Sequence, residues 1–320
     1  GAKAGGGPGD DRKLASWAQT VDYFKRLDAA SDRMIFEEIG KSTMGAPFVY
    51  ATVSSPENLK NLARFRDIND RPALTLNADK FKDGQAFHGL DKFHLNNSVQ
   101  DPSLLTELVC GHLFRKAGVP APRVTHARVW LNDRDVGVYV LKEGFDPTFL
   151  RGHFDRPTGN LYDGGFCREI DQPLEKDCGT GPDDHSDLKA LRAACAVPDP
   201  VKRQAELEKV LDVDRFLSFA AMEMLCSHWD GYCRARNNYR LYFDPADGKA
   251  EFFPHGMDQM FGDPNFPLFD ITGVVGSAVI QVPEFRRRYR QRVEELLPLL
   301  NPEAVNPVID EAAQRLAAVY

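Results

Sequence analysis

Two short loops of this chain carry the residue types that hold a divalent metal on phosphate groups. The first, HWDGYCRARNN, contains Asp230 and the adjacent amides Asn237 and Asn238, and the second, PHGMDQMFGD, contains Asp258. Carboxylate and amide oxygens are the ligands that Mg²⁺ takes in sites for nucleotide phosphates. We therefore predict metal-dependent phosphoryl transfer. Asp230 would orient or deprotonate the attacking hydroxyl, and Asp258 would hold the metal together with an amide of the Asn237–Asn238 pair.

The expected secondary structure brings these two loops together. The apolar run at 214–227 predicts a buried helix whose end presents Asp230. Alternating residues at 239–243 and 250–253, joined by the turn DPADGK, predict a hairpin. Because a hairpin brings its two ends together, Asp230 and Asp258 should lie close in space. The competing interpretation is that Asp230 caps a turn and Asp258 is a surface acid.

A nucleotide site of this kind also needs a lysine on a strand that pairs with a glutamate on a helix. A helix is predicted from Pro102 to Lys116, with Asp101 as its N-cap, and its spacing places Glu107 on the inward face. A buried glutamate needs a cationic partner. The nearest candidate is Lys92, in the strand-like segment KFHL. Both residues could instead be ordinary surface charges.

A second lysine offers an alternative. A hairpin is predicted over 123–141, and Lys142 and Glu143 follow at its exit. This junction looks like a kinase hinge, whose backbone would contact adenine, so Glu143 is a candidate nucleotide-binding position. Lys142 could serve as the phosphate lysine, although the hairpin exit is a poorer position for it than the strand of Lys92.

The composition excludes several other classes of function. The 320 residues carry a net charge of −7, which argues against nucleic acid as the main partner. The basic run RRRYR at 286–290 is interpreted as the solvated face of an amphipathic helix. No apolar stretch is long enough for a membrane span, and no signal peptide is visible. None of the six cysteines has C-x-x-C spacing; Cys167 and Cys178 could pair if the protein is exported.

Together these motifs resemble the spore-coat CotH kinase family. HWDGYCRARNNYRLYFDPADGK and the following PHGMDQMFGDPN carry the resemblance, which extends over residues 73 to 318. It implies an atypical protein kinase that uses ATP with Mg²⁺ or Mn²⁺ to phosphorylate a secreted, surface or coat protein on serine or threonine. By resemblance, Asp230 is the catalytic aspartate and Asp258 the metal aspartate, while either Asn237 or Asn238 coordinates the metal.

The chain departs from the family pattern at the metal loop. The family reads W-D-x-D-Q there, whereas this chain has Gly256 in place of the first acid. The lost carboxylate should weaken metal binding, and Gly256→Asp is expected to restore it. An alternative function follows: a catalytically weak or inactive CotH-like surface or coat scaffold.

The N-terminal part, residues 1–72, does not share this resemblance. Residues 1–13 are predicted to be a flexible linker. Residues 14–72 are expected to form a small α/β segment, with a helix at 14–30, two strands and a helix from 56 to about 68. The segment 16–70 resembles the start of an M14-type zinc carboxypeptidase, but no histidine has a glutamate three residues later, so its zinc motif is absent.

The remainder, 73–320, is predicted to be the CotH kinase-like domain. The expected class is α+β: an atypical protein-kinase-like fold with a truncated N-lobe and a helical C-lobe. Helices are predicted at 186–195, 200–211 and over the last 40 residues, and a loop at 152–183. By resemblance, the protein is expected outside the cytoplasm, at the cell surface or coat.

Overall fold

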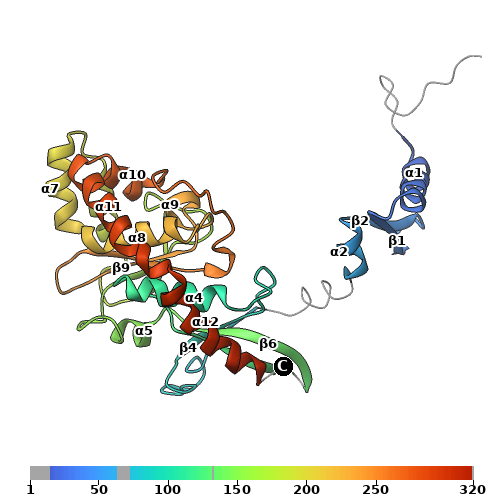
Figure 1. Ribbon diagram of the computed structural model, residues 1–320, viewed down its shortest axis with the longest axis horizontal. Coiled ribbons are helices and arrows are strands. Elements are labelled where there is room, and N and C mark those ends of the chain that lie inside the picture. The colour runs from blue at the N-terminus through green and yellow to red at the C-terminus, as the bar shows by residue number, and fades with distance from the viewer. Residues whose placement is uncertain (1–14, 63–72, 132, 319–320) are drawn as a thin grey trace, which may run out of the picture. The chain divides into compact units, whose positions relative to one another are not determined.

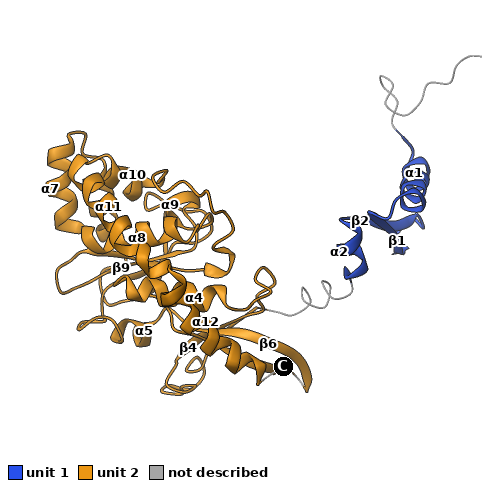
Figure 2. Ribbon diagram, in the orientation of Figure 1, with its two compact units in different colours: residues 1–71 blue, residues 72–320 orange. Residues whose placement is uncertain are grey.

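The chain divides into two compact units in a computed structural model, which describes residues 15–62, 73–131 and 133–318. One unit covers residues 1–71 and the other residues 72–320 (Figure 2). The described part is a mixed α/β structure, as predicted.

Within residues 15–62, the first unit contains two helices and one antiparallel strand pair. Helix α1 (Trp17–Ala30) starts at a capping box in which Ser16 and Gln19 satisfy each other's backbone N–H groups. Strands β1 (Met34–Lys41) and β2 (Pro47–Val53) pair as a hairpin, and α2 (Pro56–Lys60) follows. The predicted continuation of this last helix to about residue 68 lies largely outside the described residues.

A four-stranded antiparallel sheet opens the second unit. Its order is β3 (Leu74–Asn77), β4 (Lys92–Asn96), β6 (Arg134–Glu143) and β5 (Val124–Leu131). Side chains alternate between its faces. On one face Phe93 packs with Tyr139, and on the other Val138 packs with Leu104 and Leu316. Two helices, α4 (Thr106–Lys116) and α12 (Pro302–Ala317), lie near this second face (Figure 1).

Helix α4 starts four residues later than predicted. The Asp101 carboxylate does accept N–H bonds, but from Ser103 (3.0 Å) and Thr106 (2.8 Å). Leu104 has a φ of 61°, a left-handed conformation that a helix cannot include. Asp101 therefore braces a turn that leads into the helix, and does not cap the helix directly.

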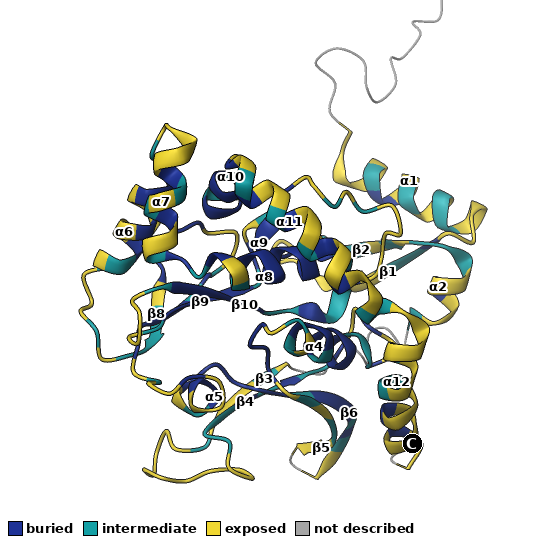
Figure 3. Cartoon of the chain, turned by 60° about the vertical axis from the view of Figure 1, so that its left-hand side comes forward, coloured by how far each residue is buried: buried dark blue, intermediate teal, exposed yellow. Residues whose placement is uncertain are grey.

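A second sheet lies at the centre of this unit, in the order β10 (Ala250–Pro254), β9 (Tyr239–Phe243), β7 (Leu161–Asp163) and β8 (Glu175–Cys178). Every residue of β9 and β10 is buried (Figure 3). Phe216 and Phe219 of α8 (Val213–Leu225) contact Phe252, and the cluster containing Phe149 contacts Phe253. Both sides of the predicted hairpin are therefore covered.

The prediction of a loop over 152–183 was wrong in part, because β7 and β8 lie inside it. These strands have three and four residues, too few to show a periodic pattern. The backbone pairs β7 with β9 and β8 with β7, and the side chains of Leu161 and Tyr162 in β7 are fully buried.

The described residues of the second unit form six further α-helices. They are α5 (Pro147–Arg151), α6 (Ser186–Cys195), α7 (Pro200–Val210), α9 (Tyr232–Ala235), α10 (Val274–Ile280) and α11 (Pro283–Leu296), with short 3₁₀ turns η1 (Met257–Gln259) and η2 (Leu297–Leu300). Phe285, Tyr289, Val293 and Leu296, on one face of α11, are buried. No helix in the described ranges is long and apolar enough to cross a membrane.

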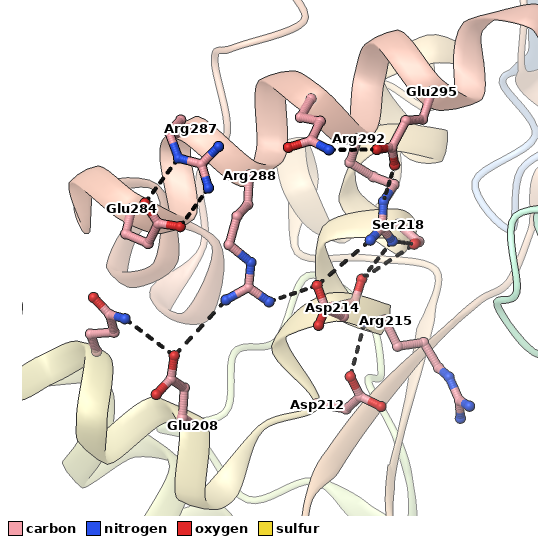
Figure 4. Close-up of polar contacts among 12 residues, drawn as sticks. Glu208, Asp212, Asp214, Arg215, Ser218, Glu284, Arg287, Arg288, Arg292 and Glu295 are labelled. Atoms are coloured by element: carbon pink, nitrogen blue, oxygen red, sulfur yellow. Dashed lines mark hydrogen bonds and ion pairs between the residues drawn. The ribbon is translucent and has the colours of Figure 1, made fainter.

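Two arginines of the basic run in α11 pair with nearby acids (Figure 4). Arg288 lies 2.6 Å from Asp214, and Arg287 lies 2.7 Å from Glu284. Arg292, further along the same helix, pairs with Glu295. Arg288 thus ties the polar side of α11 to Asp214 of α8, and Arg292 also lies 3.6 Å from that carboxylate.

Candidate active site

The loop after α8 holds Asp230 between two amides. Asn237 donates from Nδ2 to both carboxylate oxygens at 3.1 Å, and Asn238 donates from Nδ2 to Oδ2 at 2.8 Å. The helix ends at Leu225, earlier than predicted, because Ser227 adopts a left-handed φ of 57°. Asp230 is therefore presented by a turn whose shape the two asparagines fix, and its carboxylate is half-buried.

A fully buried glutamate on α8 shapes this turn from below. The Glu223 carboxylate accepts the backbone N–H groups of Tyr232 (3.0 Å) and Cys233 (2.8 Å). Its Oε1 also lies 3.3 Å from Nδ1 of the buried His228. A Cβ atom at Gly231 would come within 2.5 Å of both side chains, so only glycine fits there. Glu223 was missed in the sequence, where the signal was a lone acid in the apolar run FLSFAAMEML.

Tyr232 links this glutamate to a second buried carboxylate that the sequence analysis also missed. The Tyr232 hydroxyl lies 3.1 Å from Glu169 Oε1, and Glu169 Oε2 accepts the N–H of Val274 at 2.7 Å. Burial raises the pKa of Glu169, although these hydrogen bonds act in the opposite direction. Tyr232 is thus fixed at its backbone by one acid and at its hydroxyl by another.

The second loop adjoins the first through a backbone bond. His255 donates its N–H to the carbonyl of Asn238 at 2.8 Å. Asp258, three residues on, accepts a bond from Asn96 Nδ2 at 3.3 Å. Burial raises the pKa of Asp258, the nearby charge of Glu107 adds to the rise, and the Asn96 bond opposes it. A cation bound beside a carboxyl group in such surroundings would stabilise its charged form and lower its pKa.

Asp258 and Asn238 supply oxygen atoms that fit Mg²⁺. The Asn237 Oδ1 atom already accepts the N–H of Cys167 at 3.3 Å. Among the described residues, the side-chain hydrogen bonds of Asn238 use its Nδ2 group, so its Oδ1 is the freer ligand. Two protein oxygens are enough when phosphate and water complete the shell. No group of three or more His, Cys, Asp or Glu side chains in the described residues could hold a metal without such help.

Gly256 is tightly enclosed by this arrangement. Its φ is +54°, and a Cβ atom would lie 2.4 Å from Asn238 Oδ1. The expectation that Gly256→Asp restores metal binding therefore lacks structural support, because the new side chain would first displace the amide that could ligate the metal.

The helix glutamate pairs with Lys142, not with Lys92. Lys142 Nζ lies 2.5 Å from Glu107 Oε1, with side chains only 6% and 1% exposed. The same Glu107 oxygen accepts the N–H of Met257 at 3.4 Å, which joins α4 to the loop of Asp258. Lys142 points toward α4 because it lies on the same face of β6 as Val138 and Val140. The predicted Lys92–Glu107 pair was wrong.

The two other predicted nucleotide-binding residues have partners of their own. Lys92 lies 3.6 Å from Asp177. Glu143 is buried and binds Arg123 twice, through the Arg123 backbone N–H (2.7 Å) and guanidinium (2.5 Å). The backbone N–H groups of Glu143 and Gly144 are also used, by the carbonyls of Arg123 and Lys92. The predicted contact from this hinge-like backbone to adenine would have to use carbonyl groups.

A cavity of about 250 Å³ lies beside the ion pair. Its walls include Lys142, His94, Asn96, His255 and Gly256. His94 is the cross-strand neighbour of Lys142, and burial, with the charge of Lys142 second, lowers its pKa to about 3. The two histidine rings lie 5.9 Å apart and are neutral at physiological pH, since burial also lowers the pKa of His255. Lys142 is therefore the main positive charge on this wall.

Comparison with known proteins identifies the family of the second unit. The family described as CotH kinase protein matches residues 64–320. The chain belongs to this family. The resemblance predicted over residues 73–318 is thus confirmed, and the match begins nine residues earlier. The likeness of residues 16–70 to a peptidase start stays a prediction.

Several curated relatives share this region. The chain is 24% identical to "Inner spore coat protein H" of Bacillus subtilis (strain 168), over 74% of this chain and 70% of the relative. It is 25% identical to "Spore coat protein homolog 1" and to "Invasin CotH3" of Rhizopus delemar, over 56% and 62% of this chain. These matches cover 32% and 35% of the fungal proteins, so the chain spans about a third of their length.

A solved structure also shows a weak likeness. It is a complex of HipA, HipB and operator DNA from Shewanella oneidensis MR-1, with 14% sequence identity and a TM-score of 0.28. The alignment covers 89% of this chain and 62% of that one. A score this low carries no argument about the fold.

Proposed function

We propose that this CotH-family chain is an ATP-dependent protein serine/threonine kinase with a two-lobed, kinase-like arrangement of its second unit. Asp230 would orient or deprotonate the substrate hydroxyl. Asp258 and Asn238, with Asn237 holding Asp230, would keep Mg²⁺ or Mn²⁺ on the nucleotide. The metal would neutralise the charge that develops on the transferred phosphoryl group.

The observation that carries the proposal is the buried pair of Lys142 and Glu107. A lysine on a strand and a glutamate on a helix form the grip on nucleotide phosphates in protein kinases. Here the same glutamate also accepts the N–H of Met257, next to Asp258. The phosphate grip and the metal loop would thus be held in one hydrogen-bonded unit, with Lys142 in the role first predicted for Lys92.

The substrate would be a surface or coat protein, and the protein itself would work outside the cytoplasm. The relatives named as a spore coat protein and as an invasin support this location. The missing carboxylate at Gly256 supports the second candidate, a weakly active or inactive scaffold of the same fold.

Two measurements separate these candidates. ATP with Mg²⁺ or Mn²⁺ should raise the melting temperature of the protein, and EDTA should abolish the rise. Labelled phosphate should pass from ATP to a serine-containing protein or to the chain itself, and Asp230→Asn should stop this transfer while ATP binding persists. Binding without any transfer by the parent protein would favour the scaffold.

A further inference from the structure

One loop beside Asp230 displays a large apolar side chain to solvent. Phe166 is 85% exposed, although it lies in the segment 164–169, whose other residues are anchored. The anchoring begins at Gly165, whose N–H is bound by Asp163 Oδ1 at 2.7 Å. It continues at Arg168, whose carbonyl accepts the Tyr239 hydroxyl at 3.2 Å. Single exposed apolar side chains are common on protein surfaces, so what distinguishes Phe166 is the group to which its loop is bonded.

The same loop is bonded to the catalytic turn. The N–H of Cys167 reaches Asn237 Oδ1 at 3.3 Å, and Asn237 Nδ2 reaches the Asp230 carboxylate at 3.1 Å. One asparagine side chain therefore separates the backbone next to Phe166 from Asp230. Glu169, at the other end of the loop, holds the Tyr232 hydroxyl of the same turn. The loop cannot move far without disturbing the turn that presents Asp230.

A second exposed aromatic ring adjoins Asp230 along the chain. Trp229, immediately before it, is 50% exposed. Two exposed arginines complete the surroundings: Arg168 on the same loop, and Arg236 directly before Asn237. The backbone next to Phe166 lies one asparagine side chain from Asp230, so a peptide with apolar and acidic side chains would gain binding energy here from each buried ring surface and each opposite charge.

We infer that Phe166, together with Trp229, forms the docking surface for the acceptor segment of the protein substrate, and selects segments with an apolar or aromatic residue near the phosphorylated serine or threonine. This inference rests on the kinase function proposed above and names the class of substrate segment for it. Phe166 acts here as a specificity-determining residue, since it contacts the substrate chain and not the reacting atoms. Acidic residues in the segment are favoured secondarily, through Arg168 and Arg236.

The test uses the full chain and a position-scanning library of serine peptides as the acceptor, with labelled ATP. The parent should prefer Phe, Leu or Trp over Ala and Lys at one or two positions near the serine. Phe166→Ala should raise KM for the preferred peptide roughly tenfold or more, since burial of an aromatic ring is lost. The affinity for ATP with Mg²⁺ should not change, and Phe166→Leu should recover part of the preference.

Phe81→Ala is the matched control, because Phe81 is 93% exposed on the connection between β3 and β4. It should leave the peptide KM unchanged. If Phe166→Ala transfers phosphate with the parental KM and preference, or if the parent prefers no apolar residue at any position, the docking surface is wrong while the kinase proposal stands. If the parent transfers phosphate to no peptide and not to itself, the kinase proposal fails and the docking inference falls with it.

Discussion

Breaking the ion pair between Lys142 and Glu107 by one substitution should strongly destabilise the protein. Both side chains are almost fully buried, at 6% and 1% exposure. Lys142→Met removes the cation and leaves the Glu107 carboxylate with one long bond, from Met257 at 3.4 Å. An uncompensated buried charge of this kind costs about 3–5 kcal/mol. We expect a loss of this size in the free energy of unfolding.

Two further variants make the comparison specific. Lys92→Met is the matched control: Lys92 is 25% exposed and lies 3.6 Å from Asp177, so its loss should cost about 1 kcal/mol or less. The double variant Lys142→Met with Glu107→Leu removes both charges, and it should recover most of the stability lost by Lys142→Met alone.

The assay is denaturant unfolding of the full chain, followed by circular dichroism, with the m-value compared between variants. The reasoning is refuted if Lys142→Met costs no more than Lys92→Met, or if the double variant is less stable than Lys142→Met alone. Nucleotide binding provides a second readout. Lys142→Met should weaken ATP binding by roughly tenfold or more, the value of a charge-assisted hydrogen bond, and Lys92→Met should weaken it less.

Four other predictions follow from the site and the core. Asp230→Asn should cost about 1–2 kcal/mol, because the amides of Asn237 and Asn238 lose a charged acceptor, and phosphate transfer should vanish; transfer at the parental rate would contradict the catalytic role. Gly256→Asp should lower the melting temperature and fail to tighten Mn²⁺ binding, with Gly256→Ala as the control for the Cβ clash; tighter binding would show that Asn238 can move aside. Glu223→Gln should lower the free energy of unfolding by about 2–4 kcal/mol, and it should reduce kcat by a larger factor than it changes the KM for ATP. Glu294→Gln, on the exposed side of α11, should have neither effect, and equal effects of the two variants would dismiss Glu223 as a positioning residue. Burial raises the pKa of Glu251 to about 7, so the folded state keeps a proton that the unfolded chain releases near pH 4.3. The free energy of unfolding should therefore fall by roughly 3 kcal/mol between about pH 4.5 and 7, relative to Glu251→Gln measured in the same buffers, and parallel curves for the two proteins would disprove the shift.

The elements of the site were predictable where a periodic pattern marks them. The hairpin of β9 and β10 follows from alternation at 239–243 and 250–253. Glu107 was placed inward by its helical spacing, and it is buried. Each of these inferences uses only the geometry of one element, which is local in the sequence.

The partners of these residues could not be predicted in the same way. Lys92 begins β4 and Lys142 lies near the end of β6. With His94 opposite Lys142, both lysines lie on the same face of the sheet, and only their positions along it decide which ammonium reaches Glu107. Register depends on pairing between segments some 45 residues apart, which one sequence does not reveal. The contacts of Glu223 and Glu169 are also tertiary. For Glu223 the only available signal was its charge in an apolar helix, and Glu169 lies in a segment predicted to be a loop.

The packing of α8 has a consequence for how the protein is made. The turn with Asp230 follows α8, and α8 lies against α11, whose residues 283–296 leave the ribosome later than both candidate site loops. The Tyr289 hydroxyl of α11 donates a hydrogen bond to the carbonyl of Leu268 at 2.6 Å, which ties the segment after the second site loop to α11. A nascent chain that ends before α11 would contain every candidate catalytic residue and still expose the apolar side of α8. Premature stop codons between positions 270 and 283 should therefore yield chains that quality-control proteases remove, even though the reactive motifs have already been translated.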